Sequence, residues 1–96
     1  MPYSLEVADK AKEKLKKLSS NDKGLANRIL KKIDQILEKP THYDLLSGDL
    51  QGARKARAGD YRIIFEVYED ERMVMILDIG HRRDIYSYSN LSKINR

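Results

Sequence analysis

Two turn signals divide residues 53–79 into three short runs that fit three neighbouring β-strands. The pair Gly59-Asp60 separates the first run, 53–58, from the second, 61–68, and an acidic segment separates the second from the third, 72–79. A Gly-Asp pair between two such runs is typical of a tight hairpin turn. The spacing therefore predicts an antiparallel meander of three strands.

The second run carries the pattern of a strand with two different faces. Its odd positions are Tyr61, Ile63, Phe65 and Val67, and its even positions are Arg62, Ile64, Glu66 and Tyr68. Because successive residues of a strand point to opposite faces, the odd set predicts the face against the core. The meander therefore needs a covering layer on one face and leaves its other face open to solvent or a ligand.

The first forty residues supply that layer. Apolar and polar residues alternate over 3–7, as they do in a short strand. After that the apolar residues recur every three or four positions, as they do in a helix. One apolar stripe, with Asp9 as a possible N-cap, predicts a helix over 9–18, and a second stripe predicts a helix that ends before Lys39-Pro40. The stripes consist of Ala8, Ala11, Leu15 and Leu18, then of Leu25, Ile29, Ile33 and Ile36 or Leu37.

These elements predict an α+β fold: an N-terminal strand, a two-helix hairpin and a three-stranded antiparallel meander, with the helices packed on one face of the sheet. Residues 41–52 are expected to form a partly ordered loop. With 96 residues and no linker or repeat, the sequence predicts a single domain over 1–96.

Composition excludes several classes of protein. The sequence has no cysteine, which rules out disulfides and thiolate metal sites, and its two histidines, His42 and His81, lie far apart. We therefore expect no metal and no cofactor. The amino terminus lacks the apolar segment of a signal peptide, and no run is long enough to span a membrane, so we expect a soluble, cytoplasmic protein without membrane association.

Positive charge is concentrated on the predicted meander. The formal net charge is +4, yet the segment 53–62 carries Arg54, Lys55, Arg57 and Arg62 against the single acid Asp60. Lys55 and Arg57 share one face, opposite Arg54, and a tight hairpin brings one of them within reach of Arg62. A charged strand that discourages edge pairing is one explanation.

An ion pair with Glu66 or Asp78 would give Arg62 a purely structural role. The lysines of the first predicted helix, Lys10, Lys14 and Lys17, fit either a solvated helix face or contacts to the phosphates of a nucleic acid. The role of Arg62 and the role of these lysines both stay open at this point.

The segment "KARAGDYRIIFEV", followed by "GHRRDIY", resembles the RelE/ParE toxin superfamily, and specifically its RelE branch. The resemblance extends over the whole chain, including the "LLSGDLQG" loop before the meander. It implies a RelE-like fold and a bacterial or archaeal toxin of a type II toxin–antitoxin system. Such a toxin is an mRNA interferase, an endoribonuclease that cleaves mRNA in the ribosomal A site and inhibits translation.

The resemblance also implies site residues. The catalytic set falls on Lys55, Arg57, Arg62, Arg82 and Tyr86, and we assign RNA binding to Arg54, His81 and Arg83. A surface position without a special role is the alternative for His81. Ala53 stands where some relatives carry a second lysine, so the general base stays open between Tyr86 and Lys55.

These residue types suit cleavage of RNA through its own 2′-hydroxyl, which yields a 2′,3′-cyclic phosphate and a 5′-hydroxyl. Guanidinium groups such as those of Arg62 and Arg82 stabilise negative charge on the phosphate oxygens. A tyrosine or lysine accepts the proton only if neighbouring cations lower its pKa. No Glu/His pair accompanies this set, so catalysis would depend on charge and on alignment of the mRNA by the ribosome.

The expected partners are a cognate RelB-type antitoxin, the ribosome with its A-site RNA, and mRNA. Two other functions stay open on the sequence. One is inhibition of DNA gyrase, as in the ParE branch, which largely lacks the basic set with Arg82 and Tyr86. The other is a non-catalytic RNA-binding module.

Overall fold

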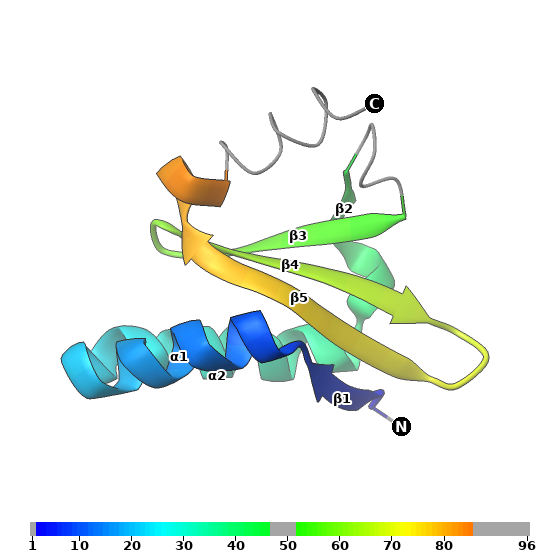
Figure 1. Cartoon of the computed structure of the whole chain (residues 1–96). Coiled ribbons are helices and arrows are strands. Elements are labelled where there is room, and N and C mark those ends of the chain that lie inside the picture. The colour runs from blue at the N-terminus through cyan, green and yellow to red at the C-terminus, as the bar shows by residue number, and fades with distance from the viewer. Residues whose placement is uncertain (1, 47–51, 86–96) are drawn as a thin grey trace.

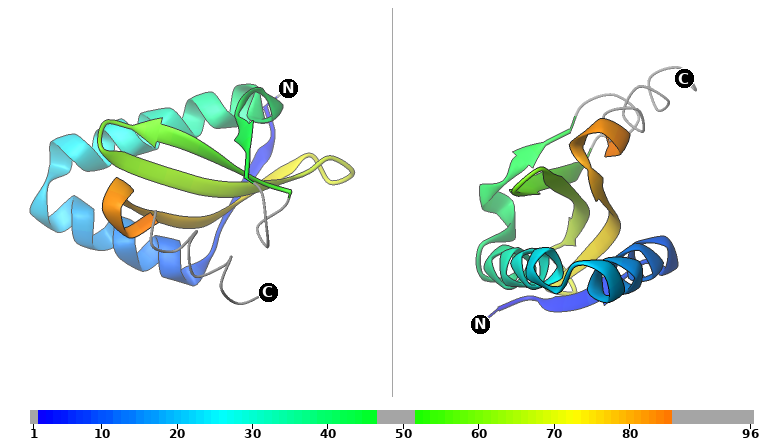
Figure 2. Two further views of the ribbon diagram at one scale, coloured as in Figure 1. Left: turned by 90° about the horizontal axis from the view of Figure 1, so that it is seen from above. Right: turned by 90° about the vertical axis from the view of Figure 1, so that its left-hand side faces the viewer.

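The structure is a computed structural model that describes residues 2–46 and 52–85 of the chain. A single sheet carries two helices on one of its faces (Figures 1 and 2). The elements are β1 (Ser4–Val7), α1 (Asp9–Asn21), α2 (Lys23–Glu38), the 3-10 helix η1 (Pro40–His42), β2 (Asp44–Leu45), β3 (Ala53–Ala58), β4 (Tyr61–Tyr68) and β5 (Met73–His81). The predicted α+β class and the helices on one face are confirmed.

The sheet has five strands in the order β1-β5-β4-β3-β2. The strands β3, β4 and β5 form the predicted antiparallel meander, and β1 pairs in parallel with β5 over Met73 to Ile76. The strand β2 was not predicted. It has only two residues, paired with Arg54 and Lys55, and is too short to show an alternating pattern.

Both helices form as predicted, although their boundaries differ. The helix α1 continues to Asn21 instead of ending at Leu18, and Asp9 lies in its first turn rather than at the N-cap, which is Ala8 without a side-chain bond. An acid in the first turn favours a helix through the macrodipole. The side chain of Asp22 caps α2 and accepts a hydrogen bond from the Leu25 N–H at 3.1 Å.

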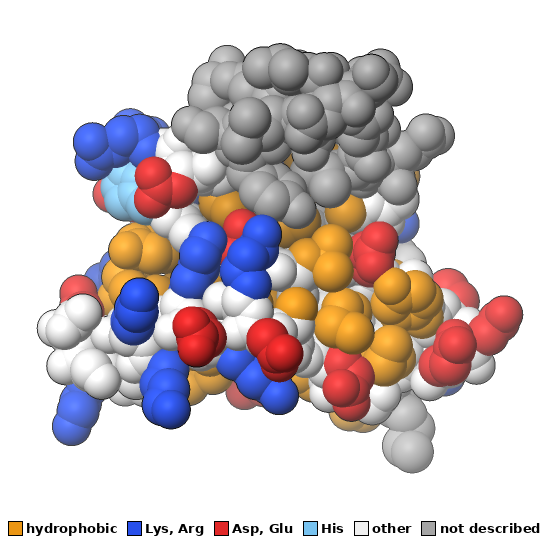
Figure 3. Space-filling view, in the orientation of Figure 1, with side chains coloured by type: hydrophobic (Ala, Val, Ile, Leu, Met, Phe, Trp, Pro, Cys, Tyr) orange, Lys and Arg blue, Asp and Glu red, His pale blue; other side chains and the backbone are white. Residues whose placement is uncertain are grey.

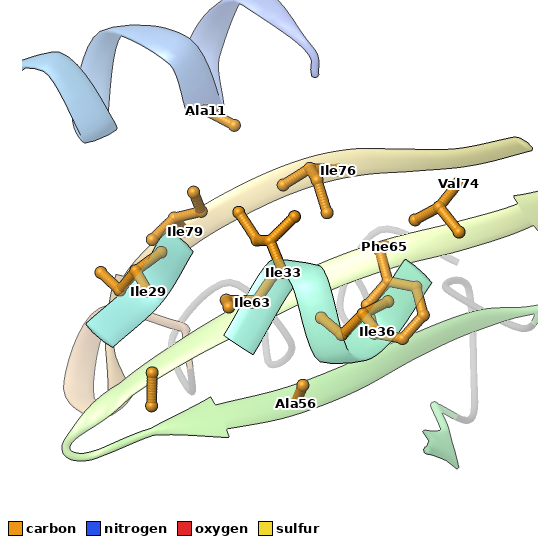
Figure 4. Packing of buried hydrophobic residues seen from close by; sticks show 11 residues of the cluster. Ala11, Ile29, Ile33, Ile36, Ala56, Ile63, Phe65, Val74, Ile76 and Ile79 are labelled. Atoms are coloured by element: carbon orange, nitrogen blue, oxygen red, sulfur yellow. The ribbon is translucent and has the colours of Figure 1, made fainter. Parts of the chain in front are cut away.

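The main core lies between the helices and the sheet (Figure 4). Its fully buried side chains include Ile29 and Ile36 from α2, Ile63 and Phe65 from β4, and Ile76 from β5, each 0% exposed. Complete burial of such a side chain contributes about 1.5–3 kcal/mol. The odd positions of 61–68 therefore face the core, as predicted.

A β-bulge lets β5 place two isoleucines on the same face. Phe65 pairs with Ile76 and Ile64 pairs with Asp78, so Leu77 is an extra residue without a partner in β4. In a regular strand Ile76 and Ile79, which are three positions apart, would point to opposite faces. The bulge brings both into the helix-side core.

The face away from the helices is partly covered, so the prediction of an open face is wrong over its centre. Ala53, Ile64 and Ile85 form a second buried cluster there. The segment after β5 turns back over the sheet, which the absence of a side chain at Gly80 permits. A Cβ at Gly80 would lie 3.4 Å from Ile85 Cγ1.

No helix within residues 2–46 and 52–85 has the length and apolar character needed to cross a membrane.

Candidate active site

Arg57 and Arg62 form the centre of the basic face. They are directly paired across the β3–β4 hairpin, and Arg62 is paired on its other side with Gly80 of β5. Directly opposed residues of an antiparallel pair have Cβ atoms about 4.5–5.5 Å apart and project to the same face. Two like charges therefore stand side by side, as the sequence predicted.

Arg62 has no carboxylate partner among the described residues. Its Nη1 donates weak hydrogen bonds to two carbonyl oxygens, those of Gly59 at 3.4 Å and Tyr61 at 3.3 Å. Carbonyl oxygens hold the half-buried guanidinium in place without neutralising its charge. Within the described residues Arg62 forms no ion pair with Glu66 or Asp78, the contacts that would have given it a purely structural role.

Asp78 binds the lysines of α1 instead. Its carboxylate is buried and accepts a 2.7 Å hydrogen bond from Lys14 Nζ and the Ile79 N–H at 2.8 Å, and Lys10 Nζ lies 3.6 Å away. Lys10 and Lys14 are therefore engaged in ion pairs and do not form a purely solvated face, which was one of the two alternatives left open by the sequence. Figure 3 shows basic side chains interleaved with acidic ones along α1, whose basic residues are all lysines.

Lys55 completes the basic group on β3. It is exposed, lies two residues from Arg57 on the same face, and is paired with Ile64 of β4. Two residues along a strand correspond to about 6.6 Å. Lys55, Arg57 and Arg62 therefore form one group of three cations on the helix-free face.

Arg82 is brought to the same end of the sheet by its backbone. The Arg82 N–H donates a 2.8 Å hydrogen bond to the carbonyl oxygen of Asp60, in the turn between β3 and β4. Its side chain is exposed. This bond fixes the segment that follows β5 beside the hairpin that carries Arg57 and Arg62. The fifth predicted catalytic residue, Tyr86, lies outside the described residues.

Of the three residues assigned to RNA binding, Arg54 lies apart from His81 and Arg83, which are in contact. Arg54 faces the helix side and donates to the carbonyl oxygens of Tyr43 at 2.7 Å and Thr41 at 3.3 Å. His81 contacts the Tyr61 ring edge-on, with centroids 5.7 Å apart. The exposed Arg83 donates its N–H to His81 Nδ1 at 3.2 Å. Arg54 therefore holds the η1–β2 segment against β3.

Tyr68 shares the face of Arg62 but is not suited to accept a proton. Its hydroxyl donates a hydrogen bond to Glu66, and this bond together with partial desolvation raises the pKa of Tyr68 above its usual value. It also lies six residues along β4 from Arg62, about 20 Å. Among the described residues, His, Asp and Glu form no group of three that could hold a metal ion.

The sequence comparison decides the family. The family model described as "ParE toxin of type II toxin-antitoxin system, parDE" matches residues 5–86, which include the helical hairpin, the meander and the basic group. The chain belongs to the RelE/ParE toxin superfamily.

Individual relatives of this superfamily are similar over nearly their whole length. A RelE-named protein of Methanocaldococcus jannaschii is 30% identical over 92 residues, which cover 95% of this chain and 98% of the relative. The mRNA interferase toxin RelE of Escherichia coli is 26% identical over 98 aligned positions, covering 97% of each chain. The toxin is therefore similar to both along its full fold.

A solved structure supports the same family. The archaeal RelE in the RelE–RelB complex from Pyrococcus horikoshii aligns with a TM-score of 0.66 and 26% identity, over 85% of this chain and 97% of the other. The toxin therefore shares both its sequence pattern and its fold with a RelE protein.

Sequence reasoning missed two features next to the site. Ile85 joins the second buried cluster and packs close to Gly80, and the signal for it, one apolar residue five positions after a glycine, was too short to interpret. The cations Arg28, Lys31 and Lys32 of α2 also lie near Arg57. Their spacing of three and four residues was available in the sequence and predicts one helix face.

Proposed function

We propose that this toxin is a ribosome-dependent endoribonuclease that cleaves mRNA in the ribosomal A site. The observation that carries the proposal is the Arg57–Arg62 pair, whose two cations share one face. None of the ion pairs recorded for the described residues engages either of them. Two opposed cations disfavour the fold by themselves but suit a phosphate that gains charge during a reaction. The likeness to the mRNA interferase of Escherichia coli supports this choice.

The reaction would use the substrate's own nucleophile. The 2′-oxygen bonds to the adjacent phosphorus, the bond from phosphorus to the 5′-oxygen breaks, and the products are a 2′,3′-cyclic phosphate and a 5′-hydroxyl. Arg62, with Arg57 and Arg82, would stabilise the charge on the non-bridging oxygens. Lys55 or Tyr86 would take the proton from the 2′-hydroxyl as the general base.

A RelB-type antitoxin is the proposed partner of the toxin in its resting state. The structural relative from Pyrococcus horikoshii was solved as a complex of RelE with RelB. In this toxin the basic group on the helix-free face offers charge complementarity to an acidic partner segment. Copurification of the toxin with the product of the neighbouring gene tests this partner.

The deciding experiment maps the ends of mRNA on programmed ribosomes. Purified toxin is added to ribosomes that hold a defined codon in the A site, and to the same mRNA without ribosomes. We expect cleavage in the A-site codon with cyclic phosphate and 5′-hydroxyl ends, and cleavage of the naked mRNA that is slower by orders of magnitude. Equal rates on both substrates would contradict the ribosome dependence.

A second candidate function is inhibition of DNA gyrase, because the family model that matches residues 5–86 is that of the ParE toxins. A supercoiling assay with purified gyrase separates the two functions. Loss of supercoiling, together with intact mRNA on programmed ribosomes, would replace the endoribonuclease with a gyrase inhibitor.

A further inference from the structure

A basic groove lies between α2 and the β3 end of the hairpin. Its volume is about 330 Å³, and its lining includes Arg28, Lys31 and Lys32 from α2, Arg57 from β3 and Gly59 from the turn. The right-hand view of Figure 2 shows α2 below β3, whereas α1 lies below β5. The groove thus begins at the edge of the candidate active site and extends toward the helix layer.

The groove stays open because the sheet ends early on this side. The strand β2 pairs only with Arg54 and Lys55, so no strand among the described residues covers the outer edge of β3 beyond them. In the turn between β3 and β4, the backbone also comes close to Arg28 of α2. Gly59 has a φ of 62°, a conformation that favours glycine, and a Cβ there would lie 3.5 Å from Arg28 Nη1.

The charge of the groove is of one sign. Four cations, Arg28, Lys31, Lys32 and Arg57, contribute to the lining, and no carboxylate does. The ion pairs that the structure records, both made to Asp78, involve none of them. Cations gathered along a low-dielectric wall produce a positive potential that an anion relieves and that concentrates anionic ligands.

We propose that this groove binds the phosphate groups of the mRNA strand next to the cleavage site. The proposal rests on the proposed function for the identity of the strand. Arg57 supplies the continuity, because it faces Arg62 across the hairpin and also lines the groove. An mRNA strand whose scissile phosphate lies between Arg57 and Arg62 would pass the open edge of β3 and contact the cations of α2.

The groove holds the backbone of the strand rather than its bases. Arg28 and Lys32 are one helical turn apart, a rise of about 6 Å, so they present two separate charges along one line. The lining residues include no aromatic side chain on which a base could stack. Binding is therefore insensitive to sequence and strongly dependent on salt.

The test measures binding of a single-stranded RNA whose 2′-hydroxyls are all methylated, so that it cannot be cleaved. Fluorescence anisotropy gives its affinity for the full chain from low to moderate salt. The groove variant is Arg28→Gln, Lys31→Gln, Lys32→Gln. The control, Lys12→Gln, Lys16→Gln, Lys23→Gln, removes the same charge from exposed positions outside the groove.

Affinity falls as salt rises, and each single-strand phosphate contact contributes about 0.7 to the steepness of log affinity against log salt. The groove variant loses three cations, so its plot should be less steep than that of the parent by about 2. The control should keep the parent slope, and both variants should unfold at the parent temperature. Equal slopes for the parent and the groove variant would overturn the proposal, as would an equal loss in both variants.

Two further measurements, of ribosome binding and of antitoxin binding, distinguish mRNA from the other possible ligands of the groove. The groove variant should sediment with empty ribosomes and bind the antitoxin as the parent does. Loss of either property with an unchanged RNA slope would assign the groove to ribosomal RNA or to the antitoxin and overturn the proposal. Failure of the parent to cleave mRNA on ribosomes, with a lowered slope in the groove variant, would remove the proposed function and leave the RNA groove.

Discussion

Arg57 and Arg62 stand directly opposite each other on adjacent antiparallel strands, and neither of the ion pairs found within the described residues involves them. Like charges in directly opposed positions destabilise a sheet by a few tenths of a kcal/mol to about 1 kcal/mol. The proposed function accounts for this pair, because its charge would be available to a phosphate ligand. This pair is therefore where stability and activity should separate most clearly.

Replacing Arg57 by glutamine should leave the free energy of unfolding unchanged or raise it by up to about 0.5 kcal/mol at low salt, because one repulsive contact is removed. The effect should shrink as salt screens the pair. Urea unfolding at low and high salt measures it. A loss of 1 kcal/mol or more at low salt would show that Arg57 has a structural role.

The matched variant Arg54→Gln should behave in the opposite way. Arg54 lies next in the same strand but donates hydrogen bonds to the carbonyl oxygens of Tyr43 and Thr41. Its loss should lower the free energy of unfolding by about 1.5–3 kcal/mol, as for other hydrogen bonds made by charged groups. The same urea titration checks this value, and an unchanged midpoint would contradict the role assigned to Arg54.

The contact of Gly80 with Ile85 should be sensitive to any larger side chain. The change Gly80→Val adds two methyl groups beyond a Cβ that already lies 3.4 Å from Ile85 Cγ1. Overpacking of this kind costs about 1–3 kcal/mol. Since the displaced segment also carries Arg82, cleavage on programmed ribosomes should fall as well. The double variant Gly80→Val, Ile85→Ala should recover stability, and a further loss would contradict the contact.

Tyr68 gives a pH-dependent signature. Its hydrogen bond to Glu66 raises its pKa, so the phenol is more easily ionised in the unfolded chain than in the folded one. The stability from this bond is therefore fully present below the unfolded pKa of about 10 and is lost as pH rises through the folded pKa. An absorbance titration of tyrosinate, with Tyr68→Phe as the reference, isolates this group.

In the Glu66→Gln variant the pKa of Tyr68 should move back toward its usual value. Tyr3 is the internal control, because its raised pKa arises first from a separate hydrogen bond to Glu69. An unchanged titration of Tyr68 in the variant would contradict the role of Glu66.

Local patterns predicted the parts of the fold that depend on neighbouring residues. The alternation of Tyr61, Ile63 and Phe65 determines the face of β4, and the structure buries that face against α2. Pairings between distant segments had no such signal. Ser4 pairs with Met73 because the helical hairpin returns the chain to β5, and neither segment shows in isolation that the two are parallel.

The candidate site was predictable to a similar degree. The Arg57–Arg62 pairing follows from turn length and strand parity, whereas the position of Arg82 depends on a backbone bond to Asp60 across the sheet. The ion pair of Lys14 with Asp78 was also missed, since a helix pattern does not show which strand lies beneath it.

The most direct test of the account is single-turnover cleavage by Arg62→Ala on programmed ribosomes, measured together with thermal unfolding and ribosome binding. The account predicts a rate about 100 to 1,000-fold below that of the parent, the cost of removing one preorganised donor to a developing oxyanion. Stability and ribosome binding should stay near parent values, and Lys23→Ala, an exposed cation at the start of α2, should cleave at the parent rate. An Arg62→Ala protein that is folded, binds ribosomes and cleaves mRNA as fast as the parent would contradict the central claim.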